Sequence, residues 1–162
     1  MGIANVLAEE IRREGLATER MLERVPKDKF DWRPHQKSMS LGELATHLAT
    51  IPQRAANLLR AGEFDVANAR PSVKPNPELN LVDEYRRNLN ELTGVVESLD
   101  NDAIRGAFVM RRGDQVVREM PKSAMIRAIG MNHSYHHRGQ LSVYLRMLDV
   151  PVPATYGTSA DE

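Results

Sequence analysis

Four long segments of this sequence repeat their apolar residues at steps of three and four, the spacing of one face of an α-helix. The helices predicted from this spacing cover residues 3–25, 41–61, 81–99 and 121–148. Pro26 ends the first segment, and Ser40 with Glu43 forms a capping-box pattern just before the second. Amphipathic helices bury their apolar faces most simply against one another, so we expect an all-α four-helix bundle.

The connections between these helices differ in length. Residues 62–80 contain several turn-forming residues and no sustained period, and so long a connection suits a crossover along the bundle between the second and third helices. Two β-prone runs flank Gly113 and Asp114 within residues 107–120, which predicts a small hairpin before the last helix. Pro52 lies inside the second helix and removes one backbone hydrogen bond, so we expect a bend there.

Length, charge and the N-terminal segment limit the remaining possibilities. The 162 residues are 41% hydrophobic, enough for one core, so we expect a single domain at 1–150 and a C-terminal tail at 151–162. The 22 Lys and Arg residues balance 22 Asp and Glu residues without a long run of one sign, which argues against nucleic-acid and membrane partners. The N-terminal segment has acidic residues and no long apolar run, so we expect a cytoplasmic protein.

Three of the five histidines lie close together inside the last predicted helix. His133 and His137 are four residues apart, so they share one helix face, and that face continues the apolar stripe expected to point to the core. His47 interrupts the apolar face of the second helix beside Leu44 and Leu48. Imidazoles that meet in an apolar interior suit a divalent metal ion, so we predict a metal site on His47, His133 and His137.

Each of these residues also has a purely structural interpretation. A lone inward histidine is more often a hydrogen-bonded core residue than a ligand, and only the pair on the last helix changes that balance for His47. Glu43 has a carboxylate that could join the site, although the capping box already explains it. Gln140 could orient a ligand, or simply make a buried hydrogen bond. Tyr144 could line the cavity, or simply be a core residue. Arg138 is expected to pair with an acidic residue of a neighbouring helix.

Two stretches of the sequence resemble the DinB superfamily of metalloenzymes: SLGELATHLATI in the second predicted helix and NHSYHHRGQLSVYLRML in the last. The HxxxHRGQ pattern at residues 133–140 is the most specific feature. The order of the four helices, the crossover and the loop at residues 32–34 extend the resemblance over nearly the whole chain. By this resemblance, the family's metal ligands correspond to His47, His133 and His137.

The resemblance also suggests what the site does. The family includes bacillithiol transferases and mycothiol-dependent maleylpyruvate isomerases, and its members often form dimers. This chain has no cysteine, so a thiol would have to come from another molecule. We therefore expect one divalent ion, zinc or nickel above all, an external low-molecular-weight thiol, a small-molecule substrate and a homodimer. A metal-dependent hydrolase and a non-catalytic, stress-associated metal-binding protein are the alternatives.

Overall fold

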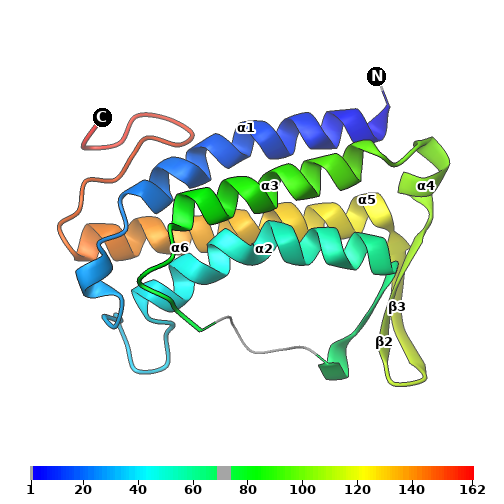
Figure 1. Cartoon of the computed structure of the whole chain (residues 1–162), viewed down its shortest axis with the longest axis horizontal. Helices are drawn as coiled ribbons and strands as arrows, with labels where there is room; N and C mark the ends of the chain where they lie inside the picture. The colour runs from blue at the N-terminus through cyan, green and yellow to red at the C-terminus, as the bar shows by residue number, and fades with distance from the viewer. Residues whose placement is uncertain (1, 69–73) are drawn as a thin grey trace.

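The computed structural model describes residues 2–68 and 74–162. Its long helices are α1 (Ile3–Glu23), α2 (Leu41–Ala61), α3 (Leu81–Glu97) and α6 (His133–Met147). They form a bundle in which α3 packs against α1 and α2, and α6 packs against the same two helices (Figure 1). Helices α2 and α3 run in the same direction, so the chain between them must return along the length of the bundle.

The helices begin and end where the local sequence satisfies their terminal backbone groups. Ser40 accepts a hydrogen bond from the Glu43 amide at 3.1 Å, and the Glu43 carboxylate accepts one from the Ser40 amide at 2.7 Å, which completes the predicted capping box of α2. Gly62 ends that helix with a φ of 72°, a conformation that glycine adopts without strain. The Asn80 side chain caps α3 by accepting from the amides of Val82 and Asp83.

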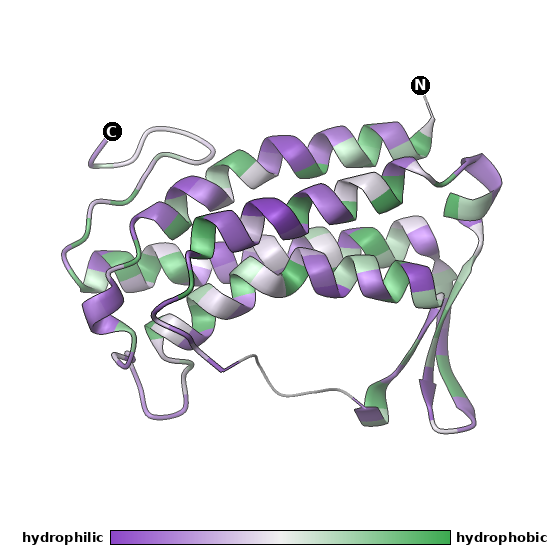
Figure 2. Ribbon diagram, viewed as in Figure 1, coloured by the Kyte–Doolittle hydropathy of each residue, from purple (hydrophilic) through white to green (hydrophobic). Residues whose placement is uncertain are grey.

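The apolar side chains form two buried clusters at opposite ends of the bundle, and Figure 2 shows the alternation of hydrophobic and hydrophilic bands along each helix. The cluster near the strands includes Ile11, Ala55, Val96, Phe108 and Ile126, and the other includes Met21, Leu41, Leu48, Leu141 and Leu145. Along the last helical segment, the buried residues of the first cluster end at Met131, and those of the second cluster begin at Leu141. Residues 132–140, which carry the clustered histidines, therefore lie between the two apolar clusters.

A small sheet accompanies the helices, so the prediction of an all-α four-helix bundle is wrong. Strand β1 (Glu63–Asp65) pairs in parallel with β2 (Ala107–Arg112), and β2 pairs in antiparallel fashion with β3 (Gln115–Pro121). The two later strands are the predicted hairpin, with Gly113 at φ 58° in its turn. Three residues carry no periodic signal, so β1 becomes recognisable as a strand only through its pairing with β2.

The last predicted helix is divided into three parts. It begins as α5 (Lys122–Met125), continues as a π-helical segment at Ile126–Asn132, and becomes regular again in α6. A π-helical turn holds more residues than an α-helical turn, so it rotates the side chains that follow relative to those before it. The segment ends one residue before His133, and it therefore sets the direction in which α6 presents both of its inward histidines.

Shorter elements fill the connections. A 3₁₀ turn at Lys27–Lys29 follows α1, and the five-residue helix α4 (Asn101–Arg105) follows α3. The predicted crossover at residues 62–80 begins with β1 and a 3₁₀ turn at Val66–Asn68, and its residues 69–73 lie outside the described residues. Figure 1 shows α2 changing direction near its middle, where Pro52 lies. None of the described helices is long and apolar enough to cross a membrane.

The C-terminal tail packs against the bundle through one buried charge pair and its neighbours. Arg138 is buried and donates to the Glu14 carboxylate of α1 at 2.9 Å, which is the predicted pairing with an acid of a neighbouring helix. The Tyr156 hydroxyl of the tail also donates to Glu14, at 2.6 Å, and Val152 is buried. This contact therefore joins α1, α6 and the tail. Removing either partner of the ion pair would leave an uncompensated charge.

Gly42 provides a test of the packing at the start of α2. A Cβ atom at this position would lie 2.7 Å from the buried ring of Phe30, so Gly42→Ala should force the ring to move and lower the free energy of unfolding by about 1–3 kcal/mol. Denaturant unfolding monitored by circular dichroism measures this change. The control is Gly94→Ala in α3, where no atom lies within 4 Å, and there the better helix former should stabilise the chain slightly. Equal stabilities of the two variants would contradict the described packing.

Candidate metal centre

Three histidines from two helices meet in the middle of the bundle. His47 comes from the second turn of α2, and His133 and His137 come from the first two turns of α6. Each offers one ring nitrogen, and these nitrogens all lie within 4.8 Å of one another. The separations between ring centroids range from 4.6 to 5.0 Å. The structure thus brings together the three residues that helical spacing had singled out, and the group could hold a metal ion.

The spacing of one pair of ring nitrogens fits a tetrahedral ion. His47 Nε2 and His133 Nε2 are 3.2 Å apart. Two imidazole nitrogens bound to zinc at about 2.0–2.1 Å with tetrahedral angles are separated by roughly 3.3 Å, so this pair already has the separation that a shared ion requires. Three nitrogen ligands leave the fourth tetrahedral position to water or to a substrate.

Gln140 fixes the orientation of one imidazole. The His137 Nδ1–H group donates to Gln140 Oε1 at 2.7 Å, and Gln140 lies three residues further along α6, one helical turn away. A proton on Nδ1 leaves the lone pair of Nε2 available for a metal ion. Such a partner on the opposite nitrogen is typical of metal-binding histidines, because it selects the tautomer and holds the ring in place.

The surroundings keep the three histidines uncharged at neutral pH. Burial, followed by the charges of the other two imidazoles and of Arg54, lowers the pKa of His47 to about 4. Burial is also the main reason that the pKa of His133 falls to about 4, and it lowers the pKa of His137 in the same way. A neutral imidazole is the form that binds metal ions, so the apolar setting prepares all three rings as ligands.

The site contains a cation that the spacing analysis did not identify. Arg54 lies two helical turns after His47 on α2, is half-buried, and adds its charge to the fields acting on His47 and His133. Its Cζ atom lies over the ring of Phe64 in β1, 5.3 Å from the ring centre. The sequence signal was a charged residue seven positions, or two helical turns, after His47, which places it on the inward face of α2.

The other candidate residues have different roles. Glu43 is held in the capping box, its carboxylate also lies 3.7 Å from the Arg33 guanidinium, and it does not belong to the histidine group. Tyr144 is buried and donates its hydroxyl to the Met39 carbonyl at 3.2 Å, while its ring meets Trp32 edge to face. Tyr144 therefore holds the loop before α2 against α6.

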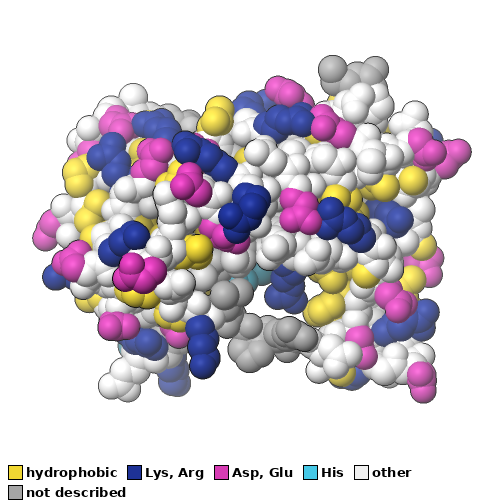
Figure 3. Space-filling model, viewed as in Figure 1, with side chains coloured by type: hydrophobic (Ala, Val, Ile, Leu, Met, Phe, Trp, Pro, Cys, Tyr) yellow, Lys and Arg dark blue, Asp and Glu magenta, His cyan; other side chains and the backbone are white. Residues whose placement is uncertain are grey.

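An open cavity of about 270 Å³ adjoins the histidine group. Its lining consists of Lys37, Ser38, Met39, His137, Gln140 and Tyr144. Histidine surface is also visible at the bottom of a hollow in the face shown in Figure 3, next to a basic side chain. A small molecule in the cavity would lie beside the His137 ring, so this side of the histidine group is accessible from outside the bundle.

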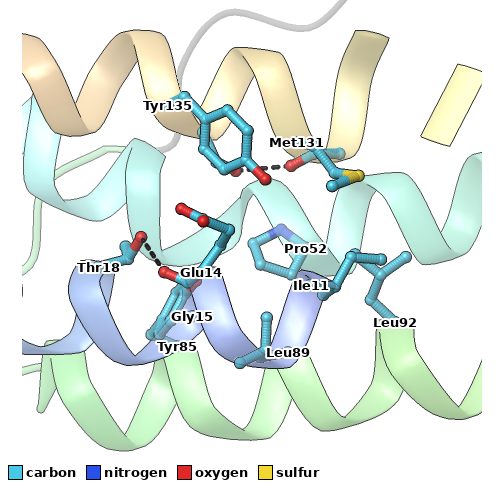
Figure 4. Close-up of a pocket in the computed structure, with 12 residues that line it drawn as sticks. Ile11, Glu14, Gly15, Thr18, Pro52, Tyr85, Leu89, Leu92, Met131 and Tyr135 are labelled. Carbon is cyan, nitrogen blue, oxygen red and sulfur yellow. Dashed lines mark hydrogen bonds between the residues drawn. The ribbon is translucent and has the colours of Figure 1, made fainter. Parts of the chain in front are cut away.

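A second cavity lies deeper in the bundle and is too small for a substrate. It measures about 20 Å³, room for one water molecule, and Pro52, Gly130 and Met131 are among its lining residues. Figure 4 shows Tyr135 pointing from α6 into the space between Glu14 and Pro52. The Tyr135 hydroxyl is buried without a hydrogen-bond partner among the described residues, which makes it a natural partner for such a water.

Comparison with known proteins identifies the family. The model of the DinB family matches residues 1–162. The chain belongs to the DinB family. It is 25% identical over 131 residues to the uncharacterized protein YjoA of Bacillus subtilis, and the match covers 80% of each protein.

Two solved structures share the fold of this DinB-family chain. The crystal structure of the DinB-like protein YjoA from Bacillus subtilis has a TM-score of 0.70 and 19% sequence identity, with 94% of this chain and 99% of that chain covered. A DinB-like protein from Bacillus cereus has a TM-score of 0.66 and 17% identity, with 93% and 95% covered. At these identities the likeness establishes the fold alone.

The lowered pKa values predict a pH dependence of stability for the metal-free protein. In the folded chain His47 and His133 bind protons only near pH 4, whereas unfolded histidine does so near pH 6.5. The unfolded state therefore holds more protons between these values, so the free energy of unfolding should fall as the pH is lowered from 7 toward 4. Denaturant unfolding at pH 7 and pH 5 measures the decrease.

The matched comparison for this pH dependence is the double variant His47→Gln, His133→Gln. It removes both groups, so its stability should fall less between pH 7 and pH 5 than that of the unmodified chain. An equal decrease in both proteins would mean that these imidazoles are not the buried neutral groups described above.

Proposed function

We propose that this chain binds one divalent metal ion on His47, His133 and His137 and acts as a metal-dependent transferase that joins a low-molecular-weight thiol to an electrophile. The observation that supports the proposal is the convergence of three neutral ring nitrogens within 4.8 Å, to which the described residues add no carboxylate and no fourth histidine. Such a ligand set leaves one position for an exogenous molecule, as catalytic zinc sites do.

The ligands indicate which metal ion the site would hold, and that ion indicates which reaction it would support. Imidazole suits both zinc and nickel, so the ligand set favours these two ions without separating them. When bound, such an ion would lower the pKa of a thiol at its open position and so provide a nucleophile at neutral pH. The chain has no cysteine of its own, so the thiol must be a second molecule.

The side chains around the group have roles that suit this reaction. Gln140 holds the His137 ring in the tautomer that leaves Nε2 available. The cavity of about 270 Å³ beside His137 and Gln140 offers room for an electrophile next to the open position. Both substrates would then meet at one edge of the histidine group.

The alternatives predict a different set of groups around the site. Hydrolysis would benefit from a general base, and no carboxylate belongs to the histidine group in the described part of the chain. A purely structural metal site would be closed by a fourth protein ligand, for which Glu43 is the nearest candidate by sequence. The Glu43 carboxylate instead accepts from the Ser40 amide at 2.7 Å, which favours an open site.

Metal content provides the first test. Protein purified without a metal-affinity column and then exposed to zinc or nickel should hold about one ion per chain by mass spectrometry. His47→Ala, His133→Ala and His137→Ala should each lose the ion while circular dichroism shows a folded bundle. His35→Ala is the matched control, because His35 is exposed in the loop before α2, where its ring accepts a hydrogen bond from the Lys37 amide. Full metal content in all three variants would refute the site.

Thiol conjugation tests the reaction. The metal-loaded chain should accelerate the reaction of small thiols with chlorodinitrobenzene, which releases chloride, or their addition to an unsaturated ketone, at least about tenfold over the metal-free chain. His133→Ala should abolish the difference, and His35→Ala should retain it. Metal-loaded protein that leaves the rate unchanged across a broad panel of thiols and electrophiles would rule out the transferase. The homodimer stays a prediction that analytical ultracentrifugation can check in the same preparations.

A further inference from the structure

The charge around the histidine group is one-sided. The three imidazoles are neutral ligands, so a divalent ion bound to them would keep its full charge. Arg54 lies two helical turns after His47 on the same face of α2, is half-buried, and adds a permanent positive charge to that face. No carboxylate belongs to the histidine group within residues 2–68 and 74–162. An occupied site would therefore carry a strong excess of positive charge in a half-buried position, which favours an anionic ligand.

Arg54 is also unusual among the arginines of this chain. Most of the others that point along helix surfaces pair with acids, as Arg60 on the same helix does with Glu91. Arg54 has no acidic partner within 4.0 Å among the described residues, and the sequence of residues 69–73 contains neither Asp nor Glu. A half-buried guanidinium without a carboxylate is costly unless another group supplies the negative charge.

The position of the Arg54 side chain suits a ligand at the metal site. Arg54 follows His47 by seven residues, two helical turns, so both side chains leave the same face of α2. The Arg54 Cζ atom lies 5.3 Å from the centre of the Phe64 ring, a contact that restricts the motion of the guanidinium. The ring offers no oxygen or nitrogen acceptor, so the guanidinium donors remain available to a carboxylate.

We propose that Arg54 binds a carboxylate of the thiol that occupies the open metal position, so that the site selects small thiols with an acidic group. The inference rests on the proposed function, because it names the class of thiol for the same site. The thiol sulfur would lie beside the three ring nitrogens, and its carboxylate would accept hydrogen bonds from the guanidinium. Arg54 is thus a specificity residue, and the metal ligands remain His47, His133 and His137.

Cobalt-loaded protein allows the inference to be tested by binding rather than by turnover. Cobalt(II) can replace zinc at histidine sites, and a thiol that reaches it changes the visible absorption spectrum. Titrations with mercaptopropionate, mercaptoethanol and cysteamine compare an acidic, a neutral and a basic thiol of similar size. The chain should bind mercaptopropionate at least about tenfold more tightly than mercaptoethanol, and cysteamine most weakly.

Variants at Arg54 separate its charge from its bulk. Arg54→Met should bring the affinities for mercaptopropionate and mercaptoethanol to within about twofold of each other, while Arg54→Lys should retain part of the preference. Cobalt content should be unchanged in both variants. Arg60→Met is the matched control, since Arg60 lies on the same helix and pairs with Glu91, and it should keep the full preference.

The outcomes distinguish this inference from the proposed function. Thiol binding without a preference for the acidic thiol, or a preference that survives Arg54→Met, would overturn the role of Arg54 and leave the metal site intact. A preference that depends on Arg54 without any thiol conjugation would support the role of Arg54 and refute the transferase. Failure of the unmodified chain to bind cobalt would refute both.

Discussion

The neutral state of three partly or fully buried imidazoles is the constraint on which the rest of this structure depends. The ring centroids of His47, His133 and His137 lie within 5.0 Å of one another, so a proton on any of them would disfavour protonation of the others in a poorly solvated space. The same neutral form supplies the lone pairs that a metal ion needs. Burial therefore serves packing and ligation together, and the proximity of Arg54 reinforces it by opposing protonation.

The site lies in a polar layer between two apolar clusters. In α6, His133 and His137 face α2, while Arg138 on another face is buried against Glu14 of α1. The apolar clusters on either side hold the helices together, so the layer between them can contain polar groups that need fixed partners. The π-helical segment ends where this layer begins, and π-helical turns occur frequently beside functional sites.

Much of the fold and of the candidate site could be predicted from short-range patterns. The capping box placed the start of α2 at Leu41, and the four-residue spacing of His133 and His137 placed both on one face. The prediction of an all-α bundle failed at β1, because a three-residue strand depends on its pairing with β2. The π-helical segment was also out of reach, since its hydrogen-bond pattern depends on packing against α2 and on no residue type.

The sequence by itself determined the helical periods, their caps and the inward placement of His47, His133 and His137, because these features follow from contacts between residues close in the chain. Only the tertiary structure decided that His47 of α2 would come within 3.2 Å of His133 of α6, across 86 positions of sequence. It also decided that Arg54 would lie beside that group without an acidic partner in the described part of the chain, while Arg60 found Glu91. Such outcomes depend on how whole helices are aligned, and that alignment is set by the summed packing of the core.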